Sequence, residues 1–136
     1  MKVHILGCGT SSGVPRLGGE DGHGDWGKCD PANPLNRRTR SSAMVEEDGF
    51  RLLIDTGPDL RAQLLACGIA MVDAVFWTHD HADHCHGIDD LRALFHRRGS
   101  PIRGYGSDRA MAALERRFGY VFHGNHGYSQ ICSTNR

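Results

Sequence analysis

The sequence predicts an α/β fold in which a mixed β-sheet is covered by helices on one face. Short apolar runs of strand length recur along the chain, and the first two after the N-terminal run flank a tight-turn signal. Segments with apolar residues at helical spacing alternate with the later runs, and glycine or proline separates the segments. The 136 residues, 39% hydrophobic and 24% charged, are typical of one globular domain.

The first strand is predicted over residues 1–7, because this apolar run is too short for a secretion signal. Residues 7–41 are rich in Gly, Pro and Asn and lack apolar periodicity, so we expect a long irregular loop. Loops of this length in compact domains are usually functional or disordered. A β-hairpin should follow, with strands at residues 43–46 and 50–54 joined by an Asp-Gly turn.

The second half of the chain should alternate helices with strands. Apolar residues recur at helical spacing in three groups: Leu60, Leu64 and Cys67; Ile88, Leu91 and Phe95; and Met111, Leu114 and Phe118. They predict three amphipathic helices, the first ended by Gly68 and the last capped by Ser107 or Asp108. Strands are expected before the second and third helices, at residues 74–77 and 101–105.

These elements all fall within residues 1–122, which we expect to form one domain. Residues 123–136 are polar and aperiodic, and we interpret them as an irregular tail.

Charge and cysteine content restrict the class of protein. Sixteen basic residues balance sixteen acidic ones, which argues against a general nucleic-acid or membrane surface. Five cysteines without a C-x-x-C pair indicate reduced structural thiols, so we expect a cytoplasmic protein. One local basic cluster, Arg37, Arg38 and Arg40, either holds a substrate phosphate or is a solvated face.

Residues 78–84, Thr-His-Asp-His-Ala-Asp-His, directly follow the strand at 74–77 and hold three imidazoles and two carboxylates. Imidazole suits zinc or manganese and carboxylate oxygen suits harder ions, so this run offers ligands for two divalent ions. In an extended loop His79 and His81 fall on the same side. The run predicts a dinuclear hydrolase site, and the alternative is a solvated His-rich turn.

The His-x-His-x-Asp-His motif at residues 79–84 is similar to the metal motif of the metallo-β-lactamase superfamily. The segments at residues 7–15, 36–42 and 53–57 resemble, in order and spacing, the branch that contains the phosphoribosyl cyclic phosphodiesterase of phosphonate breakdown. The resemblance extends to about residue 122. It implies a metallo-β-lactamase-type αββα sandwich, of which this chain would supply the first, N-terminal half.

The resemblance also assigns roles to side chains. His79 and His81 would bind the first of two zinc or manganese ions, and Asp83 and His84 the second. A water that bridges the ions would lose its proton near neutral pH and act as the nucleophile, with Asp83 as the catalytic residue that orients it. Asp55 would accept hydrogen bonds and support residues 78–84, which we call the metal loop, unless it only caps its own turn.

The ligand set is incomplete in this sequence. In the superfamily a later histidine, a bridging aspartate and a final histidine complete the site, and these belong to a second half that the sequence does not contain. Cyclic phosphodiesterase members also carry a cysteine cluster for a structural zinc, whereas this loop offers only Cys29.

The implied function is metal-dependent hydrolysis of a small cyclic phosphate or nucleotide-like ester by a metal-bound hydroxide, that is, a phosphodiesterase. Two alternatives remain open. One is a thioester or lactone hydrolase on the same scaffold. The other is a truncated, non-catalytic metal-binding or interaction module that forms a homodimer to cover the apolar face of its sheet.

Overall fold

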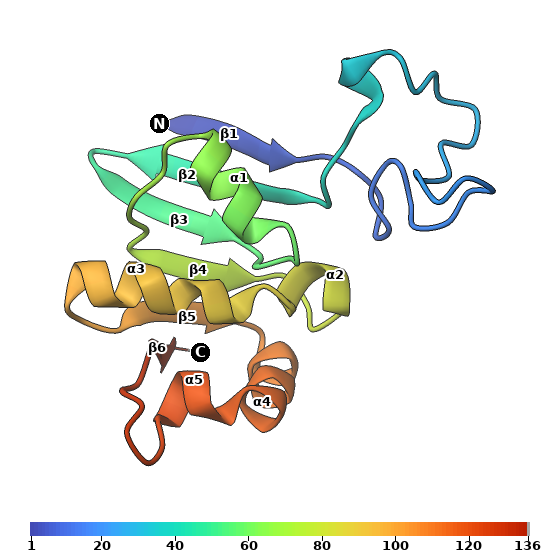
Figure 1. Cartoon of the computed structure of the whole chain (residues 1–136). Coiled ribbons are helices and arrows are strands. Elements are labelled where there is room, and N and C mark those ends of the chain that lie inside the picture. The colour runs from blue at the N-terminus through green and yellow to red at the C-terminus, as the bar shows by residue number, and fades with distance from the viewer. Residues whose placement is uncertain (136) are drawn as a thin grey trace.

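The computed structural model describes residues 1–135. A single sheet holds six strands in chain order: β1 (Lys2–Gly7), β2 (Ser42–Glu47), β3 (Phe50–Ile54), β4 (Ala74–Trp77), β5 (Ile102–Gly106) and β6 (Cys132–Asn135). The first three strands pair antiparallel, and β3 to β6 pair parallel (Figure 1). The predicted mixed sheet is therefore confirmed.

Helices connect the parallel strands, as a parallel pair requires a long crossover. They are α1 (Leu60–Ala66), α2 (Ala82–Cys85), α3 (Leu91–Arg98), α4 (Asp108–Arg117) and α5 (Gly119–His123), with the 3₁₀ turn η2 (Ile88–Asp90) before α3. A second 3₁₀ turn, η1 (Pro34–Asn36), lies between β1 and β2. In Figure 1, α1 and α3 lie in front of the sheet. Within residues 1–135 no helix is long and apolar enough to cross a bilayer.

The two faces of the sheet differ in what covers them. Met44, Leu53 and Val75 are direct neighbours on β2, β3 and β4, and all three are fully buried in the core against the helices. The alternate residues point to the other face. There Ile5 is 66% exposed and Phe76 is 40% exposed. The described part of the chain therefore leaves one apolar face of its sheet open, as a half-sandwich should.

The long connection between β1 and β2 contains only one turn of 3₁₀ helix, η1, and extends beyond the edge of the sheet (Figure 1). Its two arms are nevertheless joined by isolated bridges between Gly9 and Arg40 and between Val14 and Arg38. The predicted irregular loop is confirmed, and its backbone is tied together rather than unpaired.

The prediction of an irregular tail was wrong for residues 132–135, which form β6. This strand pairs parallel with β5, with Cys132 opposite Ile102. Ile131 donates its N–H to the carbonyl of Val121 (2.9 Å) and accepts from the N–H of Ile102 (2.9 Å). Two adjacent buried apolar residues are too few to show a period, so the partner strand and not the local sequence decides this element. Arg136 lies outside the described residues.

Candidate metal centre

The predicted metal residues lie at the carboxyl ends of β3 and β4. His79, His81, Asp83 and His84 follow β4, the first two in an extended loop and the last two in the single turn α2. Open α/β sheets bind ligands at this edge. The ring centroids of His79 and His81 are 4.5 Å apart, and those of His79 and His84 are 4.1 Å apart. The loop thus brings the three imidazoles together.

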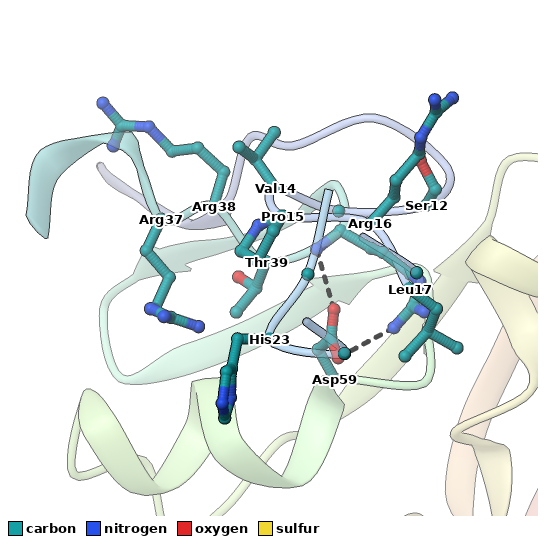
Figure 2. Close-up of a pocket in the computed structure, with 15 residues that line it drawn as sticks. Ser12, Val14, Pro15, Arg16, Leu17, His23, Arg37, Arg38, Thr39 and Asp59 are labelled. Atoms are coloured by element: carbon teal, nitrogen blue, oxygen red, sulfur yellow. Dashed lines mark hydrogen bonds and ion pairs between the residues drawn. The ribbon is translucent and has the colours of Figure 1, made fainter. Parts of the chain in front are cut away.

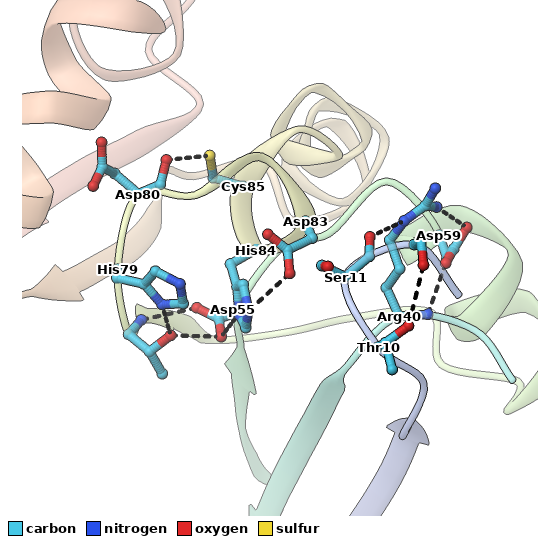
Figure 3. Close-up of polar contacts among 12 residues, drawn as sticks. Thr10, Ser11, Arg40, Asp55, Asp59, His79, Asp80, Asp83, His84 and Cys85 are labelled. Carbon is cyan, nitrogen blue, oxygen red and sulfur yellow. Dashed lines mark hydrogen bonds and ion pairs between the residues drawn. The ribbon is translucent and has the colours of Figure 1, made fainter. Parts of the chain in front are cut away.

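Asp55 comes from the end of β3 and lies beneath this loop (Figure 3). Its side chain is buried, and it accepts three hydrogen bonds. Oδ1 accepts from the backbone N–H of Thr78 (2.8 Å), while Oδ2 accepts from the Thr78 hydroxyl (2.8 Å) and from Nδ1 of His84 (2.7 Å). These three contacts join the end of β3 to residues 78 and 84.

The same contacts fix which ring nitrogens face outward. Because a carboxylate only accepts, Nδ1 of His84 is the donor to Asp55, and Nε2 lies on the other side of the ring. The Thr78 hydroxyl gives its hydrogen to Asp55, so its oxygen accepts from Nδ1 of His79, 2.9 Å away. Both imidazoles therefore use Nδ1 for a contact within the protein and leave Nε2 as the ring nitrogen available to a metal ion. Nε2 of His84 lies 3.3 Å from Oδ2 of Asp83.

The donor set suits a divalent ion of the zinc or manganese type, with imidazole nitrogens and one carboxylate in a single short loop. Within residues 1–135, however, no three His, Cys, Asp or Glu side chains converge tightly enough to form a complete metal site. The residues present therefore fit part of such a centre.

Backbone packing holds α2 against the turn after β3. Thr56 donates its N–H to the carbonyl of His84 (2.8 Å), and Gly87 donates to the carbonyl of Thr56 (2.8 Å). A Cβ atom at position 57 would lie closer to the carbonyl oxygen of Asp83 than Cβ atoms come to other atoms in real proteins, so only glycine fits there. In the Asp-Thr-Gly sequence after β3, Asp55 therefore supplies the carboxylate that contacts Thr78 and His84, and Gly57 allows the backbone of α2 to approach closely.

Arg117, on α4, is a contact that the sequence did not predict. Its guanidinium donates to the carbonyl oxygen of Asp80, lies 3.2 Å from Oδ2 of Asp80, and donates to Nε2 of His86 (2.8 Å). It also lies 3.6 Å from the buried Sγ of Cys85. Burial raises the pKa of the Cys85 thiol. A basic residue in the last turn of a helix is common, so no sequence signal marked this one.

All three arginines of the basic cluster in the long loop, Arg37, Arg38 and Arg40, line a cavity of about 380 Å³ (Figure 2). Arg40 also pairs with Asp59 (2.9 Å).

Residues 50–136 match the family of β-lactamase superfamily domains, and this match covers the supporting aspartate and the whole metal loop. The chain belongs to this superfamily. The family and the half-sandwich fold class predicted from the sequence are both confirmed.

Relatives extend the likeness to nearly the whole chain. An octanoyltransferase of Porphyromonas gingivalis is 38% identical over 126 residues, 92% of this chain and 24% of that protein. A ribonuclease Z of Salinibacter ruber is 31% identical over 93 residues, 67% of this chain and 23% of that protein. A solved structure of a diphosphatase of the PhnP family superposes with a TM-score of 0.83 at 38% identity, covering 98% of this chain and 49% of that one.

The solved structure of zinc-bound PqqB from Methylobacterium extorquens has the same fold, with a TM-score of 0.68 at 24% identity over 99% of this chain and 45% of that one. The chain thus spans about half the length of the solved relatives and about a quarter of the curated ones.

Proposed function

We propose that this protein is a metal-dependent hydrolase of phosphate esters, acting as a phosphodiesterase on a small cyclic or nucleotide-like substrate. The observation that carries the proposal is the hydrogen-bond network of Asp55. Through His84 and Thr78 it directs the Nε2 atoms of two imidazoles away from the sheet, at the edge where Asp83 also lies.

The side chains divide the work in this proposal. His79 and His81 would hold one ion, and Asp83 and His84 the other, with the remaining ligands supplied from outside residues 1–135. Bound ions would lower the pKa of a water and polarise the phosphoryl oxygen. Asp83 would orient that water, and Asp55 would keep the ring protons on Nδ1.

Two considerations favour phosphate chemistry. The diphosphatase and the ribonuclease Z among the relatives both act on phosphate-containing substrates by name. In addition, Arg37 and Arg38 have no carboxylate partner within the described residues, and guanidinium groups bind phosphate oxygens well. The second candidate is acyl hydrolysis, for example of a thioester, because the name of the P. gingivalis relative describes acyl transfer.

The test compares two substrates on protein loaded with zinc or manganese. Bis(p-nitrophenyl) phosphate should be hydrolysed, and His81→Ala should reduce the rate to background. The matched control is His96→Ala, an exposed histidine on α3 away from the metal loop, which should leave the rate unchanged.

Three outcomes would contradict the proposal. Hydrolysis that persists at the full rate after metal removal would exclude a metal-dependent reaction. Faster turnover of an acyl thioester than of the phosphodiester would favour the second candidate. Bound metal without hydrolysis of either substrate would favour the non-catalytic interaction module.

A further inference from the structure

The segment that follows β1 leaves the sheet at the same edge as the metal loop. β1 runs antiparallel to β2, which runs antiparallel to β3, so β1 has the same direction as β3. β3 is in turn parallel to β4, from which the metal loop continues. Residues 8–12 therefore start at the edge where the metal loop lies. Figure 3 shows Ser11 between Asp83 on one side and Arg40 on the other.

This segment carries three consecutive hydroxyl residues, and one of the three hydroxyls is free. Thr10, Ser11 and Ser12 are all exposed. The hydroxyls of Thr10 and Ser12 bond to each other, with 3.2 Å between the two oxygens. The Ser11 hydroxyl has no hydrogen-bond partner within residues 1–135. The hydroxyl available to a ligand is thus the one next to Asp83.

The position of residue 11 is fixed by Arg40. Its Nε donates to the carbonyl oxygen of Ser11 (3.1 Å). Asp59 holds Arg40 at two points, because Oδ1 accepts from Nη1 (2.9 Å) and Oδ2 accepts from the backbone N–H (2.8 Å). Each of the two charged side chains is only 25% exposed, so salt and water screen this ion pair less than one at the surface.

Gln63 holds the backbone next to this ion pair. It follows Asp59 by four residues, so the two side chains lie on one face of α1. Gln63 is 3% exposed, and its Nε2 donates to the carbonyl oxygen of Arg40 (2.8 Å) and to the hydroxyl oxygen of Thr39 (3.0 Å). The carbonyl oxygen of Thr39 accepts from the N–H of Gly9 (2.7 Å). The two arms of the long loop are therefore joined to α1 at their base.

The start of α1 also contacts the metal loop. Gly57 packs against the carbonyl oxygen of Asp83 at a distance that leaves no room for a Cβ atom. Leu60, the first residue of α1, donates its N–H to the carbonyl oxygen of Gly57 (3.0 Å), and Asp59 lies between them in the chain. The same short segment thus fixes both Asp83 and Ser11, so their relative position is set before a substrate binds.

We infer that Ser11 contacts the substrate, with its hydroxyl donating to an oxygen of the ester group beside Asp83. Arg40, Asp59 and Gln63 are then positioning residues that act through Ser11. The inference rests on the proposed function, which brings a phosphodiester to the metal loop. The phosphoryl oxygens of a diester accept hydrogen bonds, and a donor that is already in place loses little entropy when it forms one.

The first experiment measures binding of dimethyl phosphate, an inert diester, to zinc-loaded protein by phosphorus NMR. Ser11→Ala should weaken binding about tenfold, because one hydrogen bond to a charged group is lost. Ser11→Thr keeps the hydroxyl and should retain most of the affinity. The matched control is Ser12→Ala, the neighbouring exposed serine, which should bind as the unaltered protein does. Elemental analysis should show the same zinc content in every variant.

Two results of this experiment would overturn the contact. One is no binding of dimethyl phosphate to the unaltered protein. The other is an affinity in Ser11→Ala that equals the affinity in Ser12→Ala.

The second experiment tests whether Arg40 acts through Ser11. Arg40→Gln should also weaken diester binding about tenfold, and the double variant Ser11→Ala/Arg40→Gln should bind no more weakly than Arg40→Gln alone. Losses that multiply in the double variant would assign Arg40 a merely structural role. The control is Arg61→Gln, an exposed arginine on α1 without an ionic partner within the described residues.

Hydrogen exchange on metal-free protein gives a readout that does not depend on substrate. Exchange at residues 8–13 should rise in Arg40→Gln and stay unchanged in Arg61→Gln. Circular dichroism checks the fold of each variant. Asp59→Asn, which removes the charge that holds the guanidinium, serves as a second variant if Arg40→Gln does not fold. Unchanged exchange in a folded variant would overturn the positioning role.

Hydrolysis of bis(p-nitrophenyl) phosphate separates this inference from the proposed function. In zinc-loaded protein kcat/KM should fall about tenfold in Ser11→Ala and stay constant in Ser12→Ala. A full rate in Ser11→Ala would overturn the inference and leave the proposed function standing. Diester binding that depends on Ser11, without any hydrolysis, would refute the proposed function and support the contact.

Discussion

Asp55 contacts the metal loop through three hydrogen bonds, two to Thr78 and one to His84. It is one of two non-glycine residues with positive φ within residues 1–135, at 64°, a conformation that costs about 1 kcal/mol or more for most side chains. Asp tolerates it better than most residues because its short side chain bonds locally. Here that backbone directs the carboxylate to Thr78 and His84, so the strain is offset by three hydrogen bonds.

Asp55→Asn should weaken zinc binding by about 10–100-fold. The side-chain NH₂ group of asparagine would be a donor that faces Thr78 or His84, and both of these residues donate to the carboxylate in the unaltered protein. Zinc affinity, measured by competition with a chromophoric chelator, checks this. The matched control is Asp48→Asn, the other aspartate with positive φ (49°), which lies in the exposed hairpin turn and should bind zinc normally. Equal zinc affinity in both variants would refute the supporting role of Asp55.

The cysteines give a second prediction for single residues. Cys8, Cys29 and Cys67 are exposed, whereas Cys85 and Cys132 are buried. Burial raises the pKa of the Cys132 thiol to about 12 and also raises that of Cys85, so both remain protonated at pH 8. Iodoacetamide at pH 8 should modify three thiols in the native protein and all five in denaturant. Mass spectrometry of the intact protein gives the number of modified thiols. Native labelling of the two buried thiols would contradict the packing.

At the scale of elements, the metal loop is held by contacts from three directions. β3 supplies Asp55, the turn after β3 packs directly on α2, and α4 supplies Arg117. α2 has only one turn, and so short a helix gains little stability of its own. The position of Asp83 and His84 therefore depends on these neighbours.

Gly57→Ala should destabilise the fold by about 2–3 kcal/mol, because its new methyl group would overlap the carbonyl oxygen of Asp83 and force α2 to move. Urea unfolding measures the change. Gly119→Ala is the control, since a Cβ at this position in α5 meets only the ring of His123 at 4.0 Å. That variant should be as stable as the unaltered protein or slightly more so. Similar destabilisation by both would show that the Gly57 contact is unimportant.

Arg117→Gln should lower zinc affinity about tenfold, because the loop loses its bonds to Asp80 and His86. Arg117→Lys keeps the charge without the planar fork and should restore only part of the affinity. The control is Arg116→Gln, in the same helical turn and exposed. Hydrogen exchange at residues 80–86 should rise in the Arg117→Gln variant alone. Unchanged exchange would show that α4 does not hold the loop.

For the molecule as a whole, sequence patterns predicted the strands, helices and site residues whose placement depends on residues close to them in the chain. Turn residues and periodicity predicted five strands and the main helices, and one contiguous motif predicted the metal residues. The pairing of β6 with β5 joins residues 30 apart, and the Arg117 contacts join residues 31 to 37 apart. No local pattern encodes such partners, so the tail was misread and Arg117 was missed.

The open face is a property of the whole sheet. Two rows of paired residues cross it: Val3, Val45, Leu52 and Ala74, and Ile5, Ala43, Ile54 and Phe76. All eight are apolar, and contiguous apolar surface of this kind mediates association or aggregation. This chain covers only 49% of the solved diphosphatase of the PhnP family.

The chain of residues 1–136 should therefore self-associate in solution through this face. Ile5→Lys places a charge in one apolar row and should shift the sedimentation coefficient toward that of a monomer, while leaving the core side of the sheet intact. Leu17→Lys is the control, because Leu17 is 96% exposed in the long loop and away from the sheet. Analytical ultracentrifugation at several concentrations should show association in the control and not in the Ile5 variant. A monomeric unaltered chain at all concentrations would show that the apolar rows alone do not drive association.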